Sequence, residues 1–114
     1  MMTVGELYEL LDRLPYACDD FKVRFTTRDR STYVEPETWD IDDADDFIWK
    51  DDYDGVPYTV YNMKRLLADE DDEYSFTKKT HVYYYDWNEE RHYSPQFARC
   101  AINWKRERVD VWMD

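Results

Sequence analysis

Apolar residues recur every three or four positions near the start of the chain, as on one face of an α-helix: Val4, Leu7, Tyr8, Leu10, Leu11 and Leu14. This spacing predicts an amphipathic helix over residues 4–14. Thr3 and Glu6 fit a capping box, in which the threonine hydroxyl accepts a hydrogen bond from the glutamate N–H. Pro15 lacks the N–H that would continue the helix, so the helix ends there.

Alternation of apolar and polar residues, which is typical of half-buried strands, predicts much of the remaining structure. The predicted strands cover residues 21–26, 32–34, 80–87, 98–104 and 109–113. The apolar side of the first strand is expected to face the helix. The last two strands form a hairpin connected by Lys105–Glu107. Ser94 and Pro95 also fit a helix N-cap and first position, so a helix over residues 95–103 remains an alternative.

The middle of the chain has a weaker pattern. Residues 37–55 are acidic and carry scattered apolar anchors, which indicates a helical or loop excursion pinned to the body with its charges outward. The anchors are Trp39, Ile41, Phe47, Ile48 and Trp49. Residues 56–61 favour a strand, and Pro57 places that strand at a sheet edge. Asn62 is expected to cap a short helix that carries the apolar residues following it.

A length of 114 residues suits a single domain that spans residues 1–114. The elements predict an α+β fold, in which an N-terminal helix packs on an antiparallel sheet of about four or five strands. The acidic excursion interrupts this scaffold. Leu10 and Leu11, followed by acids and a strand, are echoed by Leu66 and Leu67, again followed by acids and a strand. This self-similarity is too degenerate to establish a repeat.

The charge of the chain is concentrated in one segment. The formal net charge is −12, and residues 35–73 hold 15 carboxylates against three bases (Lys50, Lys64 and Arg65), which is the whole imbalance. The flanking residues hold 12 acids and 12 bases. Simple disorder does not fit, because acidic disordered chains are poor in aromatics, whereas this chain has 5 Phe, 5 Trp and 11 Tyr.

Several classes of protein conflict with this composition. Nucleic-acid binding and binding to anionic membranes both require a basic surface. The start of the chain has no basic stretch followed by an apolar run, and no apolar run reaches the ~20 residues of a membrane helix. We therefore expect a cytoplasmic protein. Cys18 and Cys100 are expected to be buried free thiols, because two cysteines are too few for a disulfide scaffold.

The sequence shows no pattern that calls for a cofactor, a metal or catalysis. Residues 50–55 superficially match an EF-hand loop, but Lys50 and Tyr61 would then occupy its first and twelfth positions, where calcium needs carboxylates. His81 and His92 lack the spacing of zinc ligands, and Cys100 lies in an apolar pattern rather than beside a base. We therefore expect no cofactor, no metal and no enzymatic activity, with calcium binding and catalysis as lesser alternatives.

The acidic segment, residues 35–73, is the strongest functional signal. Solubility is the simple explanation, but solubility surfaces normally mix both signs of charge. Duplex DNA carries one charge per ~1.7 Å, so twelve net charges match about 20 Å of duplex. We expect this segment to bind a basic protein partner, with no direct nucleic acid or membrane contact. The expected contact residues are Asp40, Asp42, Asp43, Asp45, Asp46, Asp51, Asp52, Asp54, Asp69, Glu70, Asp71, Asp72, Glu73, Trp49 and Tyr53.

Aromatic residues alternate with these acids and have two possible uses. The interleaved residues are Trp39, Trp49, Tyr53, Tyr58 and Tyr61. Tryptophan and tyrosine dominate binding hot spots, so these side chains are candidate contacts with a partner. Packing in the core is the competing use, and some of them must serve it.

The size, the clustered charge of residues 35–73 and the aromatic content resemble small acidic inhibitors encoded by phages and mobile elements. These are the DNA-mimicking anti-CRISPR and anti-restriction proteins. The opening Thr3–Leu7 also resembles the start of many small phage-encoded α+β proteins. The resemblance implies an inhibitor that occupies the basic nucleic-acid site of a bacterial defence nuclease, such as a CRISPR effector, in the host cytoplasm. Immunity proteins that neutralise nuclease toxins are similar in size and acidity and are the alternative.

Overall fold

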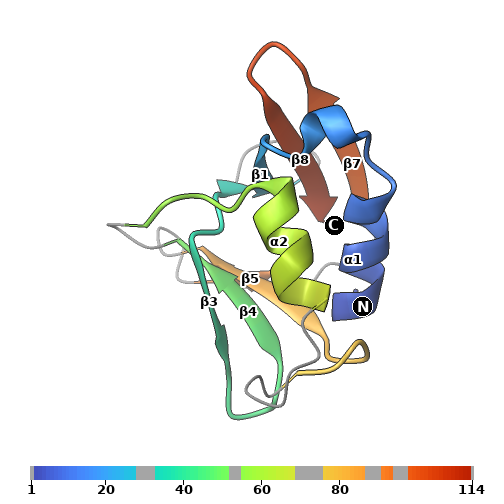
Figure 1. The fold of residues 1–114 in the computed structure, drawn as a ribbon. Helices are drawn as coiled ribbons and strands as arrows, with labels where there is room; N and C mark the ends of the chain where they lie inside the picture. The colour runs from blue at the N-terminus through green and yellow to red at the C-terminus, as the bar shows by residue number, and fades with distance from the viewer. Residues whose placement is uncertain are drawn as a thin grey trace.

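Two α-helices and eight strands form the described part of the chain in a computed structural model, which describes residues 2–27, 33–51, 55–68, 76–86, 91–93 and 98–113 (Figure 1). The elements are α1 (Val4–Asp12), the short 3-10 helix η1 (Tyr16–Cys18), β1 (Lys22–Thr26), β2 (Tyr33–Val34), β3 (Thr38–Ile41), β4 (Phe47–Lys50), α2 (Val60–Ala68), β5 (Val82–Asp86), β6 (Arg91–Tyr93), β7 (Ala98–Asn103) and β8 (Arg108–Met113). The expected α+β class with an N-terminal helix is confirmed.

The strands form two four-stranded sheets, with the orders β2-β1-β8-β7 and β3-β4-β5-β6. In each sheet the two central strands are parallel and the outer strands pair antiparallel. The expectation of one antiparallel sheet is therefore wrong in both the number of sheets and the strand direction. Local alternation shows that a segment is a strand, but the parallel partner of β1 lies more than 80 residues away in the chain, beyond the reach of local patterns.

The two sheets arise from an internal structural repeat. The first half of the chain runs α1, β1, β2, β3, β4, and the second runs α2, β5, β6, β7, β8. Each sheet combines the first strand pair of one half with the second strand pair of the other half. The two halves therefore exchange strands, and α1 and α2 pack against each other (Figure 1).

Hydrogen bonds at the helix starts follow the same repeat. The Val4 N–H donates to the carbonyl of Thr80 (2.9 Å), just ahead of β5. The Val60 N–H donates to the carbonyl of Phe21 (3.0 Å), just ahead of β1. Each half thus ties the start of its helix to the strand entrance of the other half. The weak similarity around the two Leu-Leu pairs reflects this repeat, which the fold maintains with few identical side chains.

Strand registers repeat as well. The equivalent pairs are Phe25–Val34 with Tyr84–Tyr93, and Val23–Val109 with Val82–Phe47. Residues 23–26 of β1 therefore have counterparts in residues 82–85 of β5, and every position of β4 has one in β8. This correspondence allows one half to serve as a reference for the other.

Threonine side chains cap both helices. The Thr3 hydroxyl accepts from the Glu6 N–H (3.2 Å), as the capping box predicts, and the Thr59 hydroxyl accepts from the Asn62 N–H (3.1 Å). The expectation that Asn62 caps the second helix is wrong, because α2 begins at Val60 with Thr59 as its cap. The expected edge strand over residues 56–61 is reduced to a single bridge between Thr59 and Lys22.

Two other expectations are resolved by β3, β4 and β7. The described part of the acidic stretch forms the β3–β4 hairpin rather than a helical or loop excursion. The hairpin predicted at the C-terminal side is confirmed, and β7 decides for strand over helix across residues 98–103. Residues 95–97 lie outside the described residues.

The core lies between the two helices and the two sheets. Its fully buried side chains include Leu7 and Leu11 from α1, Met63 from α2, and Phe25 and Trp49 from the sheets. Both sheets and both helices share one cluster of buried residues, so the halves form one packed unit. Within the described residues, neither helix has the length and apolar character that crossing a bilayer demands.

Candidate functional site

Four aspartates gather on the loop of the β3–β4 hairpin. We name residues 42–46, which read Asp-Asp-Ala-Asp-Asp, the aspartate loop. Asp43 and Asp45 are exposed, and Asp42 and Asp46 are half-buried. The hairpin brings four of the expected contact residues to one tip, which is the tightest group of them in the described part of the chain.

The aspartate loop is shaped by Asp42. Its carboxylate Oδ1 accepts from the N–H groups of Ala44 and Asp46, both at 2.9 Å. The Asp45 N–H closes the turn on the Asp42 carbonyl (3.0 Å), and Asp45 has a left-handed φ of 61°. Aspartate tolerates this conformation better than most residues. The Asp42 carboxylate and the Asp45 backbone therefore shape the turn.

The remaining carboxylates of the loop have no structural use among the described residues. No described residue forms an ion pair or a side-chain hydrogen bond with the carboxylates of Asp43, Asp45 or Asp46. Like charges held this close repel one another. The charge of this tip is thus left facing solvent without compensation.

The corresponding loop in the second half also has a polar side chain that accepts from the turn and a left-handed residue, but it is one residue shorter and has no clustered acids. Between β7 and β8, the Asn103 side chain accepts from the Arg106 N–H (3.0 Å), and Glu107 takes the left-handed φ, at 51°. Lys105 and Arg106 occupy this loop. The two loops lie at opposite ends of the molecule (Figure 1). The corresponding hairpin therefore closes through a different turn, with two bases in its loop in place of clustered aspartates.

Two of the other predicted acids have partners in the body of the protein. Asp40 is 63% exposed and forms an ion pair with Lys50 (3.4 Å) across the hairpin. Asp51 accepts a hydrogen bond from the Glu35 N–H (3.0 Å), which ties two segments together. The predicted residues Asp52, Tyr53, Asp54, Asp69, Glu70, Asp71, Asp72 and Glu73 lie outside the described residues.

Trp49 occupies the core rather than the surface. Its side chain has no exposed area, and its ring contacts Phe47 (4.8 Å between centroids) and Tyr58 (5.2 Å). The expectation that Trp49 touches a partner is therefore wrong. Alternation places Trp49 on the inner face of a central strand that is paired on both sides.

The other aromatics of the acidic segment divide between core and surface. Trp39 is half-buried and stacks on Phe47 with a centroid separation of 5.0 Å. Tyr58 is half-buried against Trp49. Tyr61 is 47% exposed, with the Arg65 guanidinium 5.8 Å from its ring. Only Tyr61 among these described residues offers a large exposed ring.

Neither cysteine is prepared for nucleophilic chemistry. Burial raises the pKa of the Cys100 thiol to about 12. Burial, with a smaller effect of Asp19, also raises the pKa of the Cys18 thiol. Both groups are therefore neutral thiols near pH 7, and the thiolate is the reactive form. Within the residues described, no three histidine, cysteine or acidic side chains are grouped to hold a metal ion.

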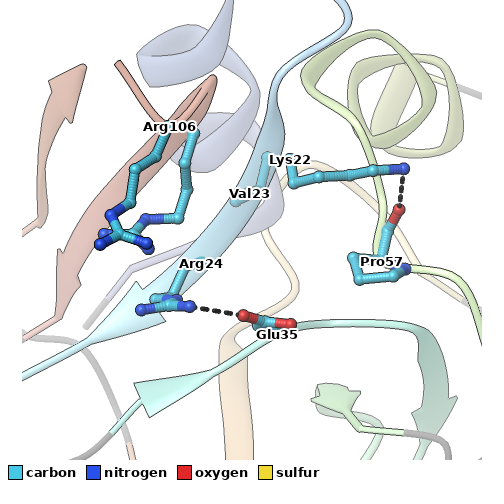
Figure 2. A pocket seen from close by; sticks show the side chains of 7 residues that line it. Lys22, Val23, Arg24, Glu35, Pro57 and Arg106 are labelled. Atoms are coloured by element: carbon cyan, nitrogen blue, oxygen red, sulfur yellow. Dashed lines mark hydrogen bonds and ion pairs between the residues drawn. The ribbon is translucent and has the colours of Figure 1, made fainter. Parts of the chain in front are cut away.

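A second charged site was missed at the sequence level. Lys22, Arg24, Arg106 and Arg108 line one pocket with Glu35, which we name the cationic pocket (Figure 2). Polar alternation in the two strands hinted at bases on their outer faces. Their meeting depends on the parallel pairing of β1 with β8, which brings Lys22 beside Arg108, and nothing local predicts that pairing.

The described residues therefore present an acidic tip at one end and a cationic pocket near the other. The acidic tip was expected from the sequence, whereas the pocket was not. Comparison with known proteins adds no family to this picture: no protein-family model, no curated protein and no solved structure matches the chain.

Proposed function

We propose that the protein acts by binding. It presents the aspartate loop and the surrounding acidic segment to the basic nucleic-acid site of a partner and blocks that site. The partner class is a bacterial defence nuclease, as the resemblance to anti-CRISPR and anti-restriction inhibitors implies. The carboxylates of the acidic segment then stand in for backbone phosphates.

One observation carries the proposal. The hairpin at the β7–β8 end closes with Lys105 and Arg106 in its loop, and in the aspartate loop only the Asp42 carboxylate forms hydrogen bonds that shape the turn, so the other three carboxylates are not needed for it. Asp43 and Asp45 are exposed and have no cation near them among the described residues. Their mutual repulsion is a cost that a basic partner would relieve.

Electrostatic steering lets the acidic tip attract a basic partner before the two proteins are in contact. A surface of one sign raises the association rate with an oppositely charged partner, and the effect weakens as salt screens the charges. The hairpin tip projects at one end of the molecule (Figure 1), where it can enter a groove before the body of the protein meets the partner.

The experiment compares two variants of equal charge. The tip variant carries Asp43→Asn and Asp45→Asn, and the control variant carries Glu9→Gln and Asp20→Asn, which remove two exposed acids outside residues 35–73. Each variant and the wild type are used to capture proteins from a lysate of bacteria that carry nucleic-acid-targeting defence systems. Captured proteins are identified by mass spectrometry.

The proposal expects a basic nucleic-acid-binding protein that duplex DNA displaces and that added salt releases. The control variant should retain it, and the tip variant should bind it at least about twofold more weakly, since each lost contact charge contributes about 0.2–1 kcal/mol or more. Capture that is indifferent to duplex DNA would refute mimicry. Equal loss in both variants would show that only net charge matters.

A further inference from the structure

The cationic pocket is a cavity of about 230 Å³ on the outer face of the sheet that contains β1 and β8. Its lining residues are Lys22, Val23, Arg24, Glu35, Pro57, Arg106 and Arg108. Figure 2 shows the Arg106 side chain reaching from its loop toward Arg24, whereas Lys22 extends the other way, to the carbonyl of Pro57. Three arginines, Arg24, Arg106 and Arg108, therefore line one small cavity.

Two of these arginines are held in fixed positions. Arg24 donates to Glu35 at 2.6 Å, and its guanidinium lies 4.2 Å from the centre of the Tyr33 ring. Arg108 forms a fork on Asp110, with its Nε at 2.8 Å and an amino nitrogen at 3.4 Å. Such clamped guanidinium groups lose little conformational entropy when an anion arrives.

Donor groups remain unused in this pocket. The Nε of Arg24 is buried and has no hydrogen-bond partner among the described residues. The guanidinium of Arg106 forms no hydrogen bond or ion pair with them, and Lys22 reaches only the Pro57 carbonyl, at 3.5 Å. A buried donor without a partner is costly, and the donors that an anion in the cavity can reach are those of Arg106 and Lys22.

Positive charge also exceeds negative charge here. The four cations that line the cavity face two carboxylates, Glu35 and Asp110, so two positive charges are unmatched. This excess lies in a chain whose net charge is −12. Because the pocket is positive in a chain that is negative overall, it is a distinct local site for an anion.

The fold does not require these bases. In the repeat, the position of Lys22 corresponds to His81, that of Arg24 to Tyr83 and that of Arg108 to Asp46. The same backbone arrangement thus forms in the other sheet without a cluster of cations. The cationic pocket belongs to the sheet that contains β1 and β8, whereas the aspartate loop belongs to the sheet that contains β3 and β4.

We propose that the cationic pocket binds a small dianionic oxyanion of the phosphate class, most suitably a phosphomonoester. A phosphomonoester carries about −1.5 to −2 charges at pH 7, which matches the two unmatched cations. Arginine forks fit the oxygens of phosphate in pairs. The cavity is smaller than the about 300–1,000 Å³ of sites for drug-sized ligands, so it holds the phosphoryl group and little of what carries it.

The test uses the full-length protein and three probes: inorganic phosphate, free O-phosphoserine and acetate. Binding is measured by calorimetry at constant ionic strength, and amide chemical shifts locate the site by NMR. Both phosphate probes should bind, acetate should bind much more weakly, and the shifts should concentrate at residues 22–24 and 106–108. Tighter binding of O-phosphoserine than of inorganic phosphate would identify a monoester as the favoured form.

Arg106→Ala is the diagnostic variant, because Arg106 is exposed and its guanidinium has no described partner. It should weaken phosphate binding about tenfold or more, the loss expected for one charge-assisted hydrogen bond. Lys105→Ala removes the same charge from the adjacent exposed position, which does not line the pocket, and should leave affinity within about twofold. Equal effects of the two variants, or the absence of phosphate-specific binding, would overturn the proposal.

These outcomes are independent of the proposed partner binding. The tip variant, with Asp43→Asn and Asp45→Asn, should bind phosphate as the wild type does, because the aspartate loop lies at the opposite end of the molecule (Figure 1). If the protein binds phosphate but captures no basic partner, the proposal for the cationic pocket holds and the mimicry proposal fails.

Discussion

Val23 and Val82 occupy the same position in the two halves of the protein. The Val23 N–H donates to the carbonyl of Tyr58 (3.0 Å), and the Val82 N–H donates to the carbonyl of Met2 (2.9 Å). Each valine is fully buried. Its strand is held by a hydrogen bond to the segment that precedes the helix of the other half. The repeat is therefore reciprocal: each half supports the first strand of the other.

The first prediction is that Val23→Ala and Val82→Ala destabilise the protein to a similar degree. Each substitution removes two buried methyl groups and leaves a small cavity, which costs about 2 kcal/mol. Urea unfolding at neutral pH measures the free energy of unfolding for both. If one substitution strongly lowers the free energy of unfolding and the other does not, the two equivalent positions do not contribute equally to stability.

The second prediction concerns the two halves as fragments. Because each sheet takes a strand pair from each half, fragments of residues 1–51 and 55–114 should not unfold cooperatively alone. Mixing them should restore the fold, since Trp49 of the first fragment pairs with Tyr84 of the second. Tryptophan fluorescence and circular dichroism follow the recovery. A fragment with its own cooperative transition would contradict the interdependence.

The third prediction is that glycine at either left-handed position stabilises the protein. Asp45 and Glu107 have φ values of 61° and 51°, which glycine adopts without the steric cost of a Cβ. Glu107→Gly should raise the free energy of unfolding by about 1 kcal/mol, and Asp45→Gly by less, since aspartate tolerates this region better. Thermal unfolding measures both, with Lys105→Gly as a control at a position without positive φ.

The fourth prediction is a loss of stability at alkaline pH caused by Cys100. The pKa of its thiol is raised to about 12 in the folded protein, whereas the pKa of an unfolded thiol is about 8.5. Above that pH the unfolded chain releases its proton while the folded protein keeps it, so unfolding becomes easier. The contribution is complete below pH about 8.5 and is lost as the pH rises toward 12.

Comparison with Cys100→Ala isolates this effect from other alkaline titrations. Between pH 9 and 11, the free energy of unfolding of the wild type should fall relative to the variant by up to about 1.4 kcal/mol per pH unit. Urea unfolding at a series of pH values provides the curves. Parallel curves for the two proteins would mean that the thiol ionises equally well in the folded state.

Local chemistry determined the parts of the fold that were predicted correctly. The Thr3 cap, the spacing of Leu7 and Leu11, and the alternation in β1 and β7 depend on neighbours within a few residues. The parallel pairing of Lys22 with Arg108 depends on segments far apart in the chain. Patterns of single segments carry no record of such pairing, so the second sheet and the cationic pocket were missed.

The candidate site divides in the same way. Clustered aspartates within five residues were visible in the sequence, and a hairpin keeps them together whatever the rest of the fold does. Trp49 was misassigned because its neighbours are acidic, although its position on the inner side of β4 places it in the core. Charge close in sequence therefore located the surface, and only the tertiary fold could assign the aromatics.

The exchange of strands between the halves also affects how the chain is made. On a ribosome, β1 and β4 emerge first, while their parallel partners β8 and β5 are still unsynthesised. The β3–β4 hairpin exposes an unpaired strand edge until β5 is made, and the β1–β2 hairpin does so until β8 is made. Such edges invite association with other chains. The acidic residues of the β3–β4 hairpin repel neighbouring nascent chains during that interval, so the same charge would protect the protein before it is folded.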